Sequence, residues 1–115
     1  MPPMPSSRRE NLLLLAWTTV ATRADAEALA RGAIESRLAA CVQIEGPVNS
    51  IFRWQDKIES VEEYRLLFKV LPARTVKLGA WIDEHHPYET PEWIVARASA
   101  VGDKYLSWAK SDATA

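Results

Sequence analysis

The 115-residue chain lacks the features that mark several classes of protein. It has one cysteine, Cys41, so an internal disulfide is excluded. Its four glycines form no glycine-rich phosphate loop. The longest apolar run, Leu12–Trp17, is too short to span a bilayer as a helix. A disulfide-stapled domain, a nucleotide-binding loop and a transmembrane helix are therefore not expected.

An excess of charge of either sign is missing as well. The chain has 14 basic and 15 acidic side chains, a formal net charge of -1. Nucleic-acid-binding domains usually carry a basic patch or excess, and a basic surface is also what attracts a protein to anionic membranes. We therefore expect neither nucleic acid nor a membrane as a partner, and the sequence identifies no protein partner.

The N-terminal segment allows two interpretations. Residues 1–10, rich in proline and serine, are predicted to be a disordered leader before a single domain at residues 11–115. Alternatively, Arg8-Arg9 and the apolar residues that follow loosely resemble a twin-arginine export signal. Cleavage near Ala26 would remove a segment that the fold needs, so we expect a leader and a cytoplasmic protein.

The first half of the chain predicts a strand, a helix and the start of a hairpin. Leu12–Thr19 is apolar at both odd and even positions, which indicates a strand buried on both faces. Thr22 is a candidate N-cap for an amphipathic helix over Arg23–Leu38. A strand then runs from Ala40 to Trp54, with a bulge or kink at Gly46-Pro47.

The second half predicts the rest of the hairpin, a helix, a strand and a short terminal helix. Glu63–Leu71 is predicted to return antiparallel to the preceding strand, with Tyr64, Leu66, Phe68 and Val70 on one face. A helix over Ala73–His85 would place Val76 and Ala80 against the sheet, with Leu78, Trp81, Ile82 and His85 as further candidates, before Pro87 ends it. The remaining elements are a strand over Glu92–Ala100 and a helix around Tyr105, Leu106 and Trp108.

The resulting order, β-α-β-β-α-β-α, predicts an α+β fold of the ferredoxin-like split β-α-β type, with a long bent hairpin and a short C-terminal helix. Such a sheet carries its helices on one face and leaves the other open. The first strand is nevertheless apolar on both sides, and the chain has five tryptophans. Because soluble monomers rarely expose large apolar patches, we expect a homo-oligomer.

Several short segments together resemble the CutA divalent-cation tolerance family. They lie in order between Leu12 and Ala109 and comprise Ala40-Cys41-Val42, Phe52-Arg53-Trp54, Lys69, His86-Pro87-Tyr88-Glu89-Thr90-Pro91-Glu92 and Tyr105-Leu106-Ser107-Trp108. The resemblance implies a homotrimer of ferredoxin-like subunits, similar in architecture to PII signalling proteins. It also implies tolerance of divalent metals, copper included, with no established reaction.

The chain departs from the pattern of the family at a few positions. Gln43 stands where asparagine is usual, Phe52 and Asp56 where tyrosine and glycine are usual, and Val70 where threonine is common. The loss of the tyrosine hydroxyl at Phe52 removes one polar contact from the expected pocket, and none of these changes threatens the fold.

Cys41 and His86 are the candidate metal ligands. Thiolate sulfur suits copper(I) or zinc, and imidazole suits copper or zinc. No Cys-x-x-Cys or His-x-x-x-His pair is present, so a tight site within one subunit is not expected, and a metal would bind either between subunits or weakly at the surface. The alternative for Cys41 is a buried small hydrophobic residue. Copper or another divalent metal is the expected cofactor, and no organic cofactor is expected.

Four further residues are predicted to line a ligand pocket: Trp54, Lys69, Tyr88 and Glu89. Trp54 would either anchor a neighbouring subunit or stack on a ligand. Lys69 would pair with Glu62 or Glu89, or present its charge to an anionic ligand. The carboxylates Glu59, Glu62 and Glu63 are interpreted as a solvated or charge-pairing face of the hairpin.

The leading hypothesis is therefore a metal-response protein of the CutA type, binding a metal ion or small ligand in clefts between subunits. The alternative is a PII-like signalling or scaffold module that binds a small anion or a partner protein. Lys69, His86, Tyr88 and Glu89 would supply a general acid and base if they converged, but no nucleophile with a base is apparent, so an enzyme is not expected.

Overall fold

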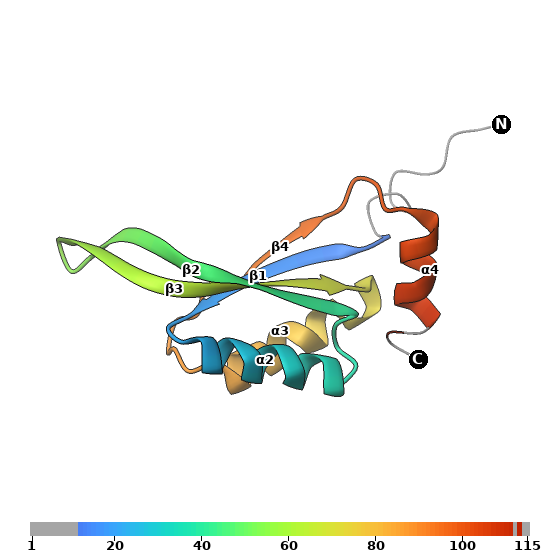
Figure 1. Cartoon of the computed structure of the whole chain (residues 1–115), viewed down its shortest axis with the longest axis horizontal. Helices are drawn as coiled ribbons and strands as arrows, with labels where there is room; N and C mark the ends of the chain where they lie inside the picture. The colour runs from blue at the N-terminus through green and yellow to red at the C-terminus, as the bar shows by residue number, and fades with distance from the viewer. Residues whose placement is uncertain (1–11, 112, 114–115) are drawn as a thin grey trace.

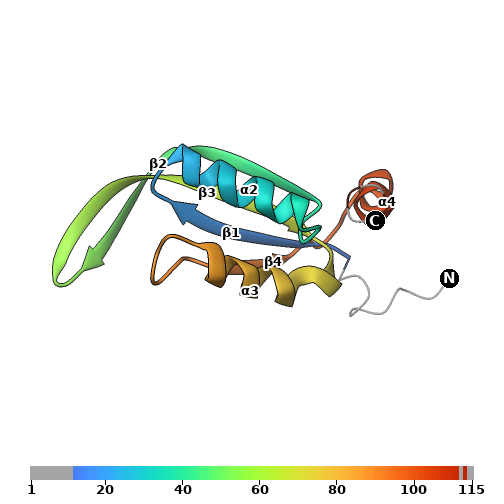
Figure 2. The same ribbon diagram turned by 90° about the horizontal axis from the view of Figure 1, so that it is seen from below.

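The computed structural model describes residues 12–111 and residue 113, and the predicted leader lies outside the described residues. The described chain forms one antiparallel sheet with helices α2 and α3 on one of its faces (Figure 1). A long hairpin projects beyond these helices at one end of the sheet, and α4 lies at the other end. Seen from below, α2 and α3 run side by side across the sheet (Figure 2).

The predicted order of elements is confirmed, and so is the α+β ferredoxin-like class. The observed elements are β1 Leu14–Val20, α2 Arg23–Glu35, β2 Cys41–Trp54, β3 Lys57–Val70, the 3-10 turn η1 Pro72–Arg74, α3 Thr75–His85, β4 Ile94–Arg97 and α4 Asp103–Ser111. The strand order is β2-β3-β1-β4, and each neighbouring pair is antiparallel.

Helix α2 ends earlier than its apolar pattern predicts. The prediction extended to Leu38, but the helix stops at Glu35 because Arg37 adopts a left-handed conformation with φ 60°. The Leu38 N–H then donates to the Ala33 carbonyl at 3.0 Å, which closes the helix as a Schellman motif. Leu38 still packs in the core, so its apolar character reflects burial after the helix rather than within it.

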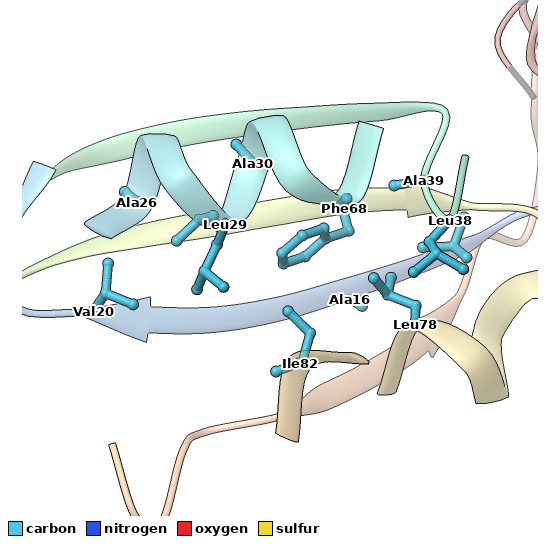
Figure 3. Close-up of a cluster of buried hydrophobic side chains, with 13 residues drawn as sticks. Ala16, Val20, Ala26, Leu29, Ala30, Leu38, Ala39, Phe68, Leu78 and Ile82 are labelled. Atoms are coloured by element: carbon cyan, nitrogen blue, oxygen red, sulfur yellow. The ribbon is translucent and has the colours of Figure 1, made fainter. Parts of the chain in front are cut away.

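The core lies between the sheet and its two helices (Figure 3). From β3, Leu66, Phe68 and Val70 point toward the helices and are fully buried. From α3, Leu78 and Ile82 meet them, one helical turn apart. This arrangement follows from the alternation of side chains along a strand and the 3.6-residue period of a helix.

The face predicted for α3 is wrong in part, because the further candidates Leu78 and Ile82 face the sheet and the first two residues, Val76 and Ala80, do not. Val76 is 85% exposed and Ala80 is also exposed, whereas Leu78 and Ile82 are buried. The face toward the sheet is thus centred on Leu78 and Ile82, which are four residues apart and therefore lie on one side of the helix.

The opposite face of the sheet is open in the single chain. The prediction that β1 is buried on both faces holds for the helix-covered face, where Leu14 and Ala16 are buried. On the open face, Leu15 and Trp17 are only half-buried. Ile94 on β4 is 54% exposed. Water therefore reaches apolar side chains on one side of the sheet.

A bulge in β2 changes which side chains face this open side. The register shifts between Glu45 and Val48, so Gly46 and Pro47 together lie opposite one residue of β3, which confirms the predicted kink. Because side chains alternate between the two faces along a strand, one extra residue moves every following side chain of β2 to the opposite face. Phe52 and Trp54 consequently lie on the open face.

The return strand starts earlier than predicted. It begins at Lys57 rather than Glu63, and Ile58 pairs with Arg53 beside a two-residue turn. The charged residues between 57 and 63 masked this part of the strand in the sequence, because its pairing is with β2 alone and not with the core.

Candidate functional site

A cleft of about 780 Å³ lies where the distal half of the hairpin meets the loop after α3. Three aromatic rings line it: Phe52 and Trp54 from β2, and Tyr88 from the loop. Phe52 is 41% and Trp54 58% exposed. Thr19, at the end of β1, forms part of the floor. The volume is in the range of small-molecule sites.

The charged side chains of the cleft are all acidic. Its lining contains four carboxylates, Glu59, Glu63, Glu89 and Glu92, and no described lysine, arginine or histidine. The cleft therefore has a negative potential that favours a cation over an anion.

Glu63 corrects a prediction made from the sequence. The sequence predicts that Glu63 lies on a solvated or charge-pairing face of the hairpin, but this residue is only 7% exposed. Its partner across the hairpin is Val48, on the open side of the sheet. Its Oε2 atom is buried without a hydrogen-bond partner among the described residues. Burial, and then the charge of Glu63, raise the pKa of the Tyr88 phenol.

His86 is buried directly after α3 and organises the loop. Its Nδ1 accepts a hydrogen bond from the Tyr88 N–H at 3.0 Å. The proton therefore resides on Nε2, which donates to the Thr19 carbonyl at 2.9 Å and lies 3.0 Å from Thr18 Oγ1. Burial lowers the pKa of His86, although the hydrogen bond to Thr19 opposes this.

The far end of the loop is held by a second contact to the same strand. The Thr18 hydroxyl donates to the Glu92 carbonyl at 2.7 Å. The loop from His86 to Glu92 is thus fixed at both ends to β1. Thr18 and Thr19 were not among the predicted site residues, although two adjacent threonines at the end of an apolar strand are a usable signal for polar contacts.

The structure brings together three of the four residues predicted to line a pocket. Trp54, Tyr88 and Glu89 all line the cleft. Lys69 does not, because it lies toward the other end of β3, where its Nζ donates to Gln43 Oε1 at 2.6 Å. The predicted pairing of Lys69 with Glu62 or Glu89 is therefore not formed.

The two candidate metal ligands lie apart. Cys41 is half-buried and pairs with Lys69 across the strands, close to Tyr105 of α4. Burial, and then the neighbouring Cys41, raise the pKa of the Tyr105 phenol. His86 instead contacts the opposite end of β1, and both of its ring nitrogens are engaged. Within the described ranges no three His, Cys, Asp or Glu side chains are grouped to hold a metal ion.

No helix in the described part of the chain is both long and apolar enough to cross a membrane.

The chain resembles proteins of one family along nearly all of the described fold. The family model for the CutA1 divalent ion tolerance protein matches residues 14–112. The chain is 37% identical over 90 residues to the divalent-cation tolerance protein CutA of Yersinia pestis (strain Pestoides F), covering 78% of this chain and 76% of that protein.

A plant protein and a solved structure agree with this match. The chloroplastic protein CutA of Arabidopsis thaliana is 31% identical over 98 residues, covering 85% of this chain but only 54% of the plant protein, so the chain spans about half of that relative. The crystal structure of the divalent ion tolerance protein CutA1 from Ehrlichia chaffeensis superposes with a TM-score of 0.86 at 29% identity, covering 90% of this chain and 95% of that one.

Proposed function

The chain belongs to the CutA1 divalent ion tolerance protein family, and from this membership we propose that it acts in the cellular response to divalent metals by binding a metal ion or a small ligand in clefts completed by subunit assembly. One observation supports the ligand-binding part. The distal hairpin and the loop after α3 together form a cleft, and three residues expected to line a pocket, Trp54, Tyr88 and Glu89, lie in it.

A homotrimer is part of the proposal. Its support is the apolar character of the open side of the hairpin and sheet, where Trp54 and Ile94 are more than half exposed. Apolar patches of this kind on soluble proteins usually mark association surfaces. Sedimentation equilibrium at micromolar concentration tests it: a trimer mass is expected, and a folded single protomer would contradict the proposal.

Copper is the metal that best suits Cys41, the single soft ligand. The residues of one chain do not fit a tight site, because Cys41 and His86 lie at different ends of the sheet and the His86 nitrogens are hydrogen-bonded. A copper site would need donors from neighbouring copies of the chain.

The proposal does not include catalysis. Lys69 lies outside the cleft, so the acid–base set considered from the sequence does not converge in one chain. The acidic lining also disfavours the small anion expected of a PII-like module. A location in the cytoplasm is also part of the proposal.

Calorimetric titration of the metal-free protein with copper and zinc tests the metal part. We expect saturable copper binding that is weakened in Cys41→Ala and His86→Ala and retained in His85→Ala, which changes the neighbouring exposed histidine. Equal binding by all four proteins would show that neither proposed ligand holds the metal.

A further inference from the structure

The buried carboxylate of Glu63 indicates what kind of ligand the cleft accepts. A buried oxygen without a hydrogen-bond donor is costly, and such groups are rare in folded proteins. Glu63 is 7% exposed, its Oε2 has no described partner, and its side chain lines the cleft. The missing interaction is a hydrogen-bond donor, and a positively charged donor would satisfy it best.

The rest of the lining points to a cation with an apolar body. Glu59, Glu89 and Glu92 add negative charge around Glu63. Phe52, Trp54 and Tyr88 present aromatic surface, which attracts both hydrocarbon and organic cations. Both features suit one ligand that carries an ammonium group on a short carbon chain.

A bare divalent cation fits this cleft less well. Such ions need several oxygen or nitrogen ligands at about 2.0–2.6 Å around one point. The four carboxylates are dispersed along the cleft, and no described group of three can converge on a metal. The volume of about 780 Å³ is also far larger than a single ion requires.

From this arrangement we propose that the cleft binds a small primary alkylammonium ion, with its N–H groups donating to Glu63. Its carbon chain would pack against Val61, the next residue on the same face of β3, and against Tyr88, whose phenol is close enough for the charge of Glu63 to act on it. The inference rests on the proposed function, because it specifies the small ligand that the cleft of this family member takes. It identifies Glu63 as the residue that selects for positive charge.

The first experiment uses the unmodified 115-residue chain in an amine-free buffer. Calorimetry compares n-butylammonium with n-butanol, which has the same carbon chain without the charge, and with inorganic phosphate. We expect saturable binding of n-butylammonium and at least about tenfold weaker binding of n-butanol, as a charged hydrogen bond implies. Equal affinity for the ion and the alcohol, or preferential binding of phosphate, overturns the proposal.

The second experiment uses two matched variants of adjacent residues. Glu63→Gln removes the charge inside the cleft, and Glu62→Gln removes the same charge from the exposed opposite side of β3, where Glu62 pairs with Asn49. We expect Glu63→Gln to weaken n-butylammonium binding by about 10–100-fold and Glu62→Gln to leave it within about twofold. Equal effects of the two variants would contradict the assignment. If Glu63→Gln does not fold, the comparison of n-butylammonium with n-butanol on the unmodified protein still tests whether the cleft selects a cation.

A copper titration of the same samples separates this inference from the proposed function. Copper binding by the unmodified protein without n-butylammonium binding overturns the inference and leaves the metal part of the proposal standing. Binding of n-butylammonium without copper supports the inference and removes the metal part. Binding of neither overturns both.

Discussion

The two halves of the β2–β3 hairpin differ in what their side chains meet. In the half that belongs to the sheet, Leu66, Phe68 and Val70 are fully buried against the helices. In the distal half, Ile51 and Ile58 are each 71% exposed, and the buried side chain is the carboxylate Glu63. One pair of strands thus provides a packed core at one end and a surface for contacts at the other.

One half of the hairpin therefore contributes mainly to folding stability, and the other half is available for binding. Apolar burial is the main favourable term in folding, and in the hairpin it is concentrated between Leu66 and Val70. The distal half contributes little burial, so its exposed rings and its carboxylates are available for ligands or for other subunits. Four substitutions test the comparison, from the largest expected effect to the smallest.

The largest effect on stability is expected from removing a buried side chain in the half of the hairpin that belongs to the sheet. Phe68→Ala removes a fully buried ring that also packs edge-on against Trp93, at 5.7 Å between centroids. We expect a loss of about 3–5 kcal/mol in the free energy of unfolding, measured by urea denaturation. Val76→Ala is the control, because Val76 is 85% exposed, and it should change stability by less than about 0.5 kcal/mol. Similar losses in both variants would refute the placement of the core.

The next effect concerns the bend that joins the two halves. Gly46 has φ 147°, and a Cβ there would lie 2.8 Å from the Tyr64 ring and 3.2 Å from the Glu63 carbonyl. Gly46→Ala should cost about 1–3 kcal/mol through backbone strain and overlap.

Gly102→Ala provides the control for this substitution, since a Cβ at Gly102 meets nothing within 4 Å. The thermal unfolding temperatures of the two variants show whether the bulge needs glycine at position 46. If Gly46→Ala unfolds at the same temperature as Gly102→Ala, the bulge does not need glycine.

A pH-dependent effect is expected from the loop that borders the distal half. Burial lowers the pKa of His86 in the folded protein, whereas the unfolded chain titrates near about 6.5. Folding therefore favours the neutral ring. The contribution of neutral His86 to stability is complete above about pH 6.5, the pKa of the unfolded chain. It decreases as the pH falls toward the lowered pKa of the folded protein. Protonation at Nδ1 would also break the hydrogen bond from the Tyr88 N–H.

Urea denaturation between pH 8 and pH 5 measures this effect. His86→Gln should be less stable by about 1 kcal/mol at pH 8, from lost hydrogen bonds, and should lose less stability on acidification than the unmodified protein. His85→Gln, a change at the adjacent exposed histidine, should keep the original pH dependence. Parallel curves for His86→Gln and the unmodified protein would rule out this role.

The smallest effect is expected at the tip of the hairpin. Gln55 and Asp56 have φ values of 49° and 65°, as a type I′ turn requires, although neither residue is glycine. Asp56→Gly should stabilise the turn by about 0.5–1 kcal/mol, because glycine adopts positive φ without strain. A decrease in the midpoint of chemical denaturation would contradict this expectation.

The sequence predicted the packed half better than the distal half. Alternation of apolar residues located Leu66, Phe68 and Val70, and the Gly46-Pro47 pair indicated the kink. Alternation alone did not reveal that residues of β2 after the bulge face the other side of the sheet. This change of face depends on how Glu45 and Val48 pair with β3.

The resemblance pointed to Trp54, Tyr88 and Glu89, and these three residues line one cleft, while their role in binding a ligand stays a prediction. Glu63 was missed because a glutamate among other glutamates normally indicates a solvated face. Its burial depends on the loop after α3, which residues far away in the sequence, Thr18 and Thr19, hold in place. Such long-range contacts leave no local pattern.

Hydrogen–deuterium exchange with and without n-butylammonium is the most direct test of the division between a packed half and a binding half. The account predicts slower exchange in the distal hairpin and in the loop from Tyr88 to Glu92, with no change from Leu66 to Val70. Slower exchange confined to the packed half, or no change anywhere at saturating n-butylammonium, would contradict it.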